Sequence, residues 1–263
     1  ADQLPHAVRT AFRAMTTGRP GAAHLCLPFD VLKQPLPAAE LWAQPGHETW
    51  PALRSAPDAH DVERAADLLV AARAPVLVCG GGVVNAGACD ALAALAEALN
   101  APVCTTVSGR GSVADSHPLH VGVVGANGGV PATKAVLAQA DLVLFIGCRI
   151  GSTTTEHWQT PSRQVTILHI DADPMTIGAN YRTAVGLVGD ARLALQALGA
   201  AVGERLARRP ADAIDGRAVA ARARAEKFAR FDELAASIER PIKPEVVVRA
   251  LNRLLPPRAI VVA

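Results

Sequence analysis

Glycines and small polar residues follow several short apolar runs in this sequence. They occupy six segments: Gly80-Gly81-Gly82, Thr105 to Gly109, Gly125 to Gly129, Gly147-Cys148-Arg149, Asp171 to Pro174 and Gly189-Asp190. Glycine lets a ligand approach the backbone, a helix N-terminus offers N–H donors to phosphate, and an Asp after a strand can accept from a ribose hydroxyl. Glycines, small polar residues and aspartates that directly follow apolar strands therefore indicate a nucleotide-binding site. Tight strand-to-helix turns explain the glycines equally well, so both interpretations stay open.

Arg149 is the cation best placed for a phosphate. It directly follows the apolar run Leu142 to Ile146 and the glycine Gly147. The planar guanidinium matches the geometry of phosphate oxygens, which favours a role in anion binding. The alternative is a salt bridge to Asp171 or Asp173.

Other chemistries find little support in the sequence. The run Gly80 to Asn85 matches only the first two glycines of GxGxxG, and Thr105-Thr106 stands where a dinucleotide site needs an acid. A nicotinamide dehydrogenase is therefore disfavoured. No GxSxG, GxxxxGK[ST] or HExxH motif occurs. We expect His117 and His120 to lie in a loop and His169 to be a hydrogen-bonded core residue.

The five cysteines show no metal or disulfide spacing. They are Cys26, Cys79, Cys89, Cys104 and Cys148, with no CxxC pair. We expect buried, reduced, structural thiols, as in a cytoplasmic protein.

Composition excludes several classes of protein. The 263 residues carry 26 basic and 24 acidic side chains, and a net charge of only +2 does not favour binding to the phosphate backbone of nucleic acid. Hydrophobic residues make up 50% of the chain, too many for a disordered protein. No apolar run approaches the ~20 residues that cross a membrane, and the first residues do not resemble a signal peptide. We expect a cytoplasmic protein without membrane or nucleic-acid partners.

The middle of the chain alternates between strand-like and helix-like periods. Continuous apolar runs start at Pro75, Pro102, Leu142, Val165 and Val185, and helical patterns separate them. Runs without polar alternation are typical of parallel strands buried on both faces. Residues 58–201 are therefore predicted to form an α/β domain with a doubly wound, parallel, Rossmann-like sheet.

The flanks have a different pattern. Residues 34–57 read as a proline-rich linker, and residues 202–241 as a helical connector that lies across a neighbour rather than in the core. Residues 1–33 hold one predicted helix (5–16) and one strand (24–27), and residues 242–263 another helix (244–255) and strand (259–262). One helix and one strand cannot bury their own apolar faces. We therefore expect the chain to be a piece of a longer polypeptide.

Several segments together resemble thiamine-diphosphate-dependent enzymes of the acetolactate synthase type. The resemblance runs from about Pro5 to Asp190 and resumes at Ile242 to Glu245. Its motifs are Gly18 to Val31, Pro75 to Gly82, Asn100 to Val103, Gly109-Arg110-Gly111, Ala140 to Val143, Gly147 to Arg149 and His169 to Pro174 with Ile177-Gly178. It implies the central domain of a three-domain enzyme, with residues 1–33 closing the pyrimidine-binding domain and residues 242–263 opening the diphosphate-binding domain.

The resemblance implies a parent enzyme that uses thiamine diphosphate and Mg²⁺ to decarboxylate a 2-oxo acid and transfer the carbanion to an acceptor. Such enzymes are homo-oligomers, dimers or tetramers. The activating glutamate and the metal motif of the family are not in this sequence, and Gly189-Asp190-Ala191 is not that motif. No catalytic residue or metal ligand is assigned, and the chain alone is expected to be inactive. The alternative is a stand-alone nucleotide-binding or scaffold domain without catalysis.

In this family the central domain holds structural FAD, ADP or nothing. By resemblance, the nucleotide contacts fall on Gly81, Gly82, Thr106, Asn127, Gly147, Arg149, Asp171 and Asp190. Two positions depart from the acetolactate synthases. The second Arg that follows the first in those enzymes is absent after Arg149, and Asn127 replaces a usual His. The missing Arg counts against flavin, and the resemblance leaves open whether the domain holds FAD, ADP or nothing.

Overall fold

The computed structural model describes residues 1–35, 41–256 and 258–261. Its centre is a six-stranded sheet in the order β3-β2-β1-β4-β5-β6, and every neighbouring pair is parallel. The strands are β1 (Pro75–Cys79), β2 (Val103–Thr105), β3 (His120–Val123), β4 (Leu142–Ile146), β5 (Thr166–Asp171) and β6 (Val185–Val188). The order reverses between β1 and β4, as in doubly wound sheets. The predicted fold class is confirmed.

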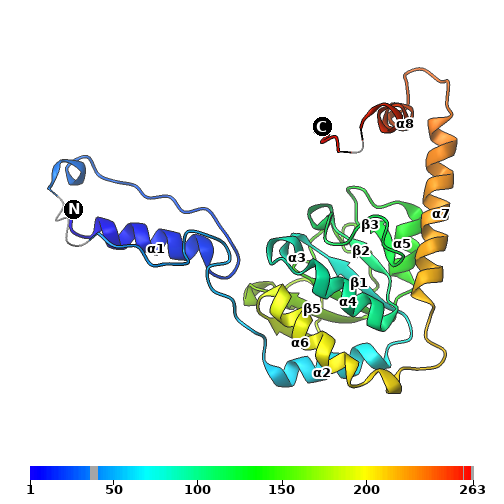
Figure 1. Cartoon of the computed structure of the whole chain (residues 1–263), viewed down its shortest axis with the longest axis horizontal. Helices are drawn as coiled ribbons and strands as arrows, with labels where there is room; N and C mark the ends of the chain where they lie inside the picture. The colour runs from blue at the N-terminus through cyan, green and yellow to red at the C-terminus, as the bar shows by residue number, and fades with distance from the viewer. Residues whose placement is uncertain (36–40, 257, 262–263) are drawn as a thin grey trace.

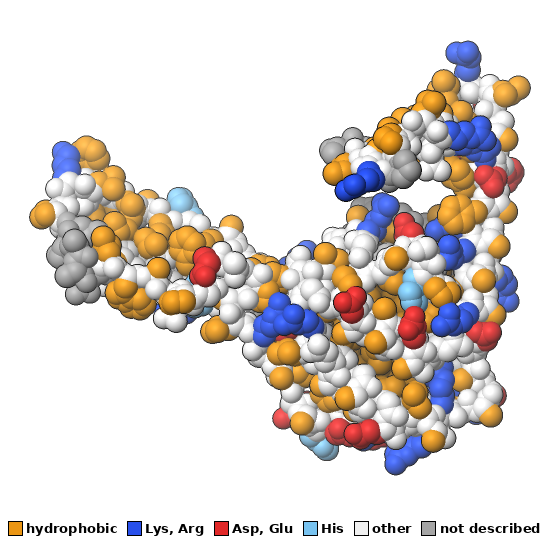
Figure 2. Space-filling model, in the orientation of Figure 1, with side chains coloured by type: hydrophobic (Ala, Val, Ile, Leu, Met, Phe, Trp, Pro, Cys, Tyr) orange, Lys and Arg blue, Asp and Glu red, His pale blue; other side chains and the backbone are white. Residues whose placement is uncertain are grey.

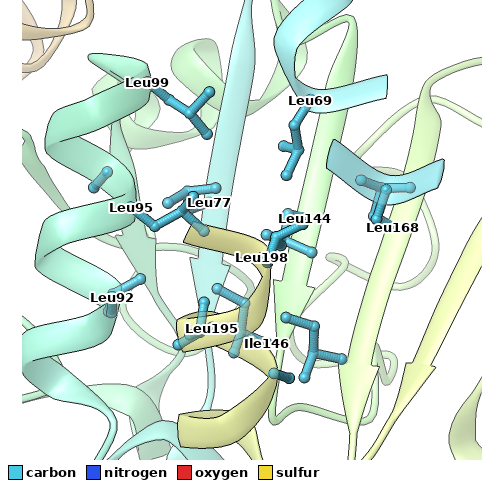
Figure 3. Packing of buried hydrophobic residues seen from close by; sticks show 14 of the residues in the cluster. Leu69, Leu77, Leu92, Leu95, Leu99, Leu144, Ile146, Leu168, Leu195 and Leu198 are labelled. Carbon is cyan, nitrogen blue, oxygen red and sulfur yellow. The ribbon is translucent and has the colours of Figure 1, made fainter. Parts of the chain in front are cut away.

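One face of the sheet is covered by α2 (Ala59–Ala71), α4 (Cys89–Leu99) and α6 (Ala191–Gly203). Leucines of α4 and α6 meet those of β1 and β4 in a continuous aliphatic core (Figure 3). Asp58 and Asp190 cap α2 and α6, because each carboxylate accepts two backbone N–H bonds from the first helical turn. Asn100 ends α4 in the left-handed conformation, which short polar residues tolerate.

The opposite face is covered by α5 (Pro131–Ala138) and α7 (Gly216–Ala235), which lies beside β3 and α5 (Figure 1). Here the structure differs from the expected connector. Ala220 and Ala223 of α7 are buried in the second core cluster, so the first half of the helix belongs to the domain core. Alanines at this i, i+3 spacing let the helix approach the sheet closely.

The prediction of a loop at His120 is wrong. His120 begins β3, the edge strand beside β2, whereas His117 precedes it in the loop. The strand is only four residues long and includes Gly122, so its apolar signal is weak.

The flanks extend from this domain. Helix α1 (Leu4–Thr16) projects away from the sheet, and α8 (Pro244–Leu254) lies beyond the end of α7 (Figure 1). The predicted strand at 24–27 is not formed, and the described part of the one at 259–262 is irregular, whereas Val262 lies outside the described residues. Apolar side chains are numerous on the surface of the N-terminal segment that contains α1 (Figure 2). None of the described helices has the length and apolar character needed to cross a membrane. Residues 36–40 of the predicted linker also lie outside the described residues.

Candidate functional site

A cavity of about 940 Å³ opens at the carboxyl ends of β1 and β4, where the strand order reverses. Open α/β sheets bind ligands at such a switch point. The loops after β2, β4 and β5, the short helix α3 (Gly81–Asn85) and the segment Trp50 to Ser55 form its walls. All eight residues that the resemblance assigns to a nucleotide lie on it: Gly81, Gly82, Thr106, Asn127, Gly147, Arg149, Asp171 and Asp190.

Close backbone packing explains two of the glycines. A Cβ on Gly82 would stand 2.7 Å from Cα of Gly147, and one on Gly147 would stand 2.6 Å from Cα of Gly82. Gly147 also has a φ of +58°, which favours glycine. The turns after β1 and β4 therefore touch through their backbones, and this contact alone requires both glycines.

Thr106 also has a structural role at the cavity wall. Its buried hydroxyl accepts a hydrogen bond from the backbone N–H of Gly109 at 3.1 Å and caps the short 3-10 helix Val107–Gly109. Gly81 faces that turn, because a Cβ on it would lie 3.2 Å from the Ser108 carbonyl oxygen. These residues shape the cavity whether or not they touch a ligand.

Arg149 is exposed, and its guanidinium makes no hydrogen bond or ion pair with any residue that the structure describes. Its carbonyl is held by the side chain of Asn180 at 3.1 Å. The alternative salt bridge is not formed, because Asp173 lies 3.7 Å from the guanidinium of Arg19 instead. A fixed backbone with an uncommitted guanidinium is suited to receive an anion.

Asp171, at the end of β5, offers a carboxylate oxygen to the cavity. Its Oδ1 accepts the backbone N–H of Asp173 at 3.0 Å, whereas Oδ2 lies 3.9 Å from Nε2 of His169. His169 is fully buried and its Nε2 donates to the Cys148 carbonyl at 2.9 Å, which confirms the predicted core role. Burial lowers the pKa of His169 although Asp171 opposes this shift. Burial therefore favours the neutral imidazole, whose Nε2–H is used by the Cys148 carbonyl rather than by Asp171.

Asp190 is already committed to protein partners. Besides capping α6, its Oδ2 lies 2.6 Å from Nη1 of Arg54, which also donates to the Ala86 carbonyl. The linker runs along the end of β6 here, and the backbone N–H of Asp190 donates to the Ser55 carbonyl at 2.9 Å. Sequence reasoning missed Arg54, because a linker without periodicity does not indicate which side chains turn inward.

Asn127 has an exposed side chain with no hydrogen bond to any described residue. It lies in the loop after β3, where the main cavity meets a smaller pocket. Its amide offers both a donor and an acceptor there.

Burial disfavours the thiolate form of three cysteines in the domain, Cys79, Cys104 and Cys148. Burial raises the pKa of Cys104 and of Cys148, which lines the cavity, to about 12. All five cysteines are free, and the expectation of burial is confirmed for Cys79 and Cys104 but wrong for the exposed Cys26. The described part of the chain places no three His, Cys, Asp or Glu side chains where they could share a metal ion.

Comparison with known proteins identifies the relatives of this domain. Residues 62–198 match the family of thiamine pyrophosphate enzyme central domains. The acetolactate synthase large subunit of Corynebacterium glutamicum is 38% identical over 200 residues, which cover 75% of this chain and 31% of that protein. Glyoxylate carboligase of Escherichia coli O157:H7 is 35% identical over 196 residues, covering 74% of this chain and 32% of the relative.

A solved structure shows the same fold. Benzoylformate decarboxylase from Polynucleobacter necessarius superimposes with a TM-score of 0.62 at 22% identity over 76% of this chain and 36% of that one. The chain spans about a third of the length of the curated relatives it matches. The matched family and the strand order agree: the chain belongs to the thiamine pyrophosphate enzyme family and contains its central domain, and acetolactate synthase large subunits are among its relatives.

Proposed function

We propose that this chain is the central part of an enzyme that uses thiamine diphosphate and Mg²⁺ to decarboxylate a 2-oxo acid and transfer the carbanion to an acceptor. Within that enzyme, the cavity at the switch point binds the ADP moiety that FAD and ADP share. The observation that carries the nucleotide assignment is the unpaired guanidinium of Arg149 inside a cavity of about 940 Å³. That volume lies within the range of about 300–1,000 Å³ that is usual for small-molecule and cofactor sites.

The residues of the cavity suit a nucleotide diphosphate. Arg149 would pair with the diphosphate, because no carboxylate of the described residues forms an ion pair with its guanidinium. Oδ2 of Asp171 would accept a ribose hydroxyl, since only Oδ1 is taken by a backbone N–H. Asn127 would contact the part of the ligand nearest the smaller pocket. Gly82 and Gly147 let the two turns pack backbone against backbone in the cavity wall.

The same residues do not suit Mg²⁺ or thiamine diphosphate. Asp190 follows a glycine as metal-binding aspartates can, but its carboxylate already serves Arg54 and two backbone N–H groups. We therefore assign thiamine diphosphate and Mg²⁺ to other parts of the parent enzyme, and we expect no decarboxylation by the chain on its own. The parent is expected to be a cytoplasmic homo-oligomer, a dimer or tetramer.

Calorimetric titration of the purified chain with FAD, ADP and NAD tests the nucleotide assignment. We expect FAD or ADP to bind. NAD carries the same ADP moiety and should bind no more tightly than ADP, because the sequence lacks the third glycine and the acid of a dinucleotide site. Arg149→Ala should weaken binding about 10- to 100-fold, because a charge-assisted hydrogen bond contributes about 1.5–3 kcal/mol. Arg222→Ala is the matched control, since Arg222 is an exposed arginine of α7 that lines neither cavity.

The outcomes separate the alternatives. Binding of FAD places the chain with flavin-containing relatives, and binding of ADP alone shows that the flavin contacts are missing. A folded chain that binds neither nucleotide, or an Arg149→Ala variant that binds like the wild type, contradicts the assignment. The catalytic proposal is tested separately on the full-length enzyme with thiamine diphosphate and Mg²⁺. It fails if no short 2-oxo acid releases carbon dioxide.

A further inference from the structure

A second, smaller cavity of about 270 Å³ lies between the loop after β3 and helix α7. We call it the basic pocket, and it is lined by Arg110, Val123, Thr133 and Lys227 together with Val107 and Asn127, which it shares with the main cavity. Two cationic residues and no acidic residue lie on its wall.

Lys227 is the central feature of this pocket. It reaches from α7 over β3, so that its Nζ stands 3.3 Å from the place where a Cβ on Gly122 would be. The side chain is half-buried, yet its ammonium has no hydrogen bond or ion pair with any described residue. Its one favourable contact among the described residues is with the ring of Phe228, whose centroid lies 4.9 Å from Nζ, and this contact leaves the N–H donors of the half-buried ammonium unused.

The charges around Lys227 increase this cost. Burial lowers the pKa of Lys227, and the nearby guanidinium groups of Arg224 and Arg110 lower it further. Asp115 acts in the opposite direction, but this carboxylate is exposed, lies 3.4 Å from Nδ1 of His120 and does not line the pocket. The wall of the pocket itself therefore carries two cations, and the carboxylate that opposes the shift lies outside that wall.

The remaining polar groups leave the anion position open. The guanidinium of Arg110 makes no hydrogen bond or ion pair with a described residue, and it is exposed at the mouth. The hydroxyl of Thr133 is used within the fold, where it lies 2.9 Å from the carbonyls of Val123 and Val130. Lys227 and Arg110 are thus the two cationic groups available to a ligand, beside the amide of Asn127.

We propose that the basic pocket is an anion-binding subsite that takes a small oxyanion, a phosphate or a carboxylate group, between Lys227 and Arg110. An ammonium and a guanidinium together supply point charge and directed N–H donors, the combination that oxyanions need. A volume of about 270 Å³ fits such a group rather than a whole cofactor. The oxyanion is either a free small anion or the end of a ligand that also occupies the adjoining cavity.

Titration of the whole chain with inorganic phosphate, and separately with pyruvate, tests the subsite at constant ionic strength in chloride. The wild type should bind at least one of them with a dissociation constant in the millimolar range. Lys227→Met keeps the aliphatic stem and removes the charge, and it should weaken binding about tenfold or more, as should Arg110→Gln. Lys243→Met is the control, because Lys243 pairs with Glu239 at 3.0 Å, away from the pocket.

Stability gives an independent readout. Because Lys227 has no ion pair with a described residue and methionine keeps the contact with the Phe228 ring, Lys227→Met should match or exceed the wild type in stability without anion, whereas loss of a structural ion pair would lower stability. Phosphate should raise the thermal midpoint of the wild type and of Lys243→Met but not of Lys227→Met. A destabilised Lys227→Met, or equal anion binding by Lys227→Met and Lys243→Met, overturns the proposal.

The source of the oxyanion is read from competition. If phosphate still binds to a chain saturated with ADP, the subsite takes a free anion. If ATP displaces phosphate from the wild type and Lys227→Met weakens the binding of ATP more than that of ADP, the subsite takes the end of a longer ligand. Arg149→Ala should leave phosphate binding intact, so failure of the nucleotide proposal and failure of the subsite are distinguishable.

Discussion

Helices α4 and α8 carry the same apolar stripe but have opposite surroundings. In α4 the stripe of Leu92, Leu95, Ala96 and Leu99 is 0–1% exposed. In α8 and the residue after it, Val247, Val248, Leu251, Leu254 and Leu255 repeat at comparable spacing and are 38–81% exposed. Both patterns define one face of a helix. Periodicity therefore predicts which face is apolar, whereas burial depends on what that face meets.

The partners of the two helices explain the difference. Helix α4 packs against α6 and the sheet, within a core that surrounds each of its leucines. Helix α8 contacts α7 through a polar residue, because Arg249 donates to the carbonyl and the carboxylate of Asp232 at 2.9 and 2.7 Å. Its apolar stripe therefore contributes little to the stability of the described chain.

The largest expected effect tests this contrast with one substitution made on both helices. Leu95→Ala in α4 should lower the free energy of unfolding by about 3 kcal/mol, because it removes a buried side chain and leaves a cavity. Leu254→Ala in α8 should change it by less than about 0.5 kcal/mol, since this side chain is 81% exposed. Urea denaturation of both variants checks the prediction. Equal losses would show that α8 is as well packed as α4.

An intermediate effect is expected at the junction between the linker and the domain. Arg54→Ala should cost about 2 kcal/mol, because it removes a charge-assisted bond to the nearly buried Asp190. Arg64→Ala, whose ion pair with Asp61 on α2 is largely exposed, should cost less than about 0.5 kcal/mol. The same denaturation measurement compares them. A cost for Arg54→Ala no greater than that for Arg64→Ala would mean that the linker is held by its backbone alone.

The sequence predicts most of this fold for a clear physical reason. Five of the six strands coincide with predominantly apolar runs, the pattern of strands buried on both faces. The edge strand β3 lacks such a run, because His120 and Gly122 leave only Val121 and Val123 as apolar residues among its four. The burial of α7 is also not predictable from the sequence pattern, because its buried residues Ala220 and Ala223 are the same type as the alanines on its exposed face.

The residues of the two cavities also divide into those that the sequence predicts and those that it does not. The eight residues that resemblance assigns follow predicted strands, and the parallel sheet brings their loops to one edge. Arg54 and Lys227 come from a linker and a helix whose positions are set by tertiary packing. Local pattern does not encode that packing, so no spacing rule would have found either residue.

The smallest expected effect concerns a buried polar side chain in the domain, compared with an exposed one in the flank. Burial holds the pKa of His169 below its usual value of about 6.5, so the unfolded chain binds more protons below that pH. Stability should therefore fall as the pH is lowered from 7 towards 5, with at most about 1.4 kcal/mol per pH unit from this group. His169→Gln keeps a donor for the Cys148 carbonyl and removes the titration, so it should flatten the dependence of stability on pH.

Part of this pH dependence should remain in His169→Gln, because burial also lowers the pKa of His120. The control His24→Asn changes an exposed ring and should leave the slope as it is. Urea midpoints at three pH values measure this, and a slope that His169→Gln leaves unchanged would mean that His169 takes up its proton inside the fold.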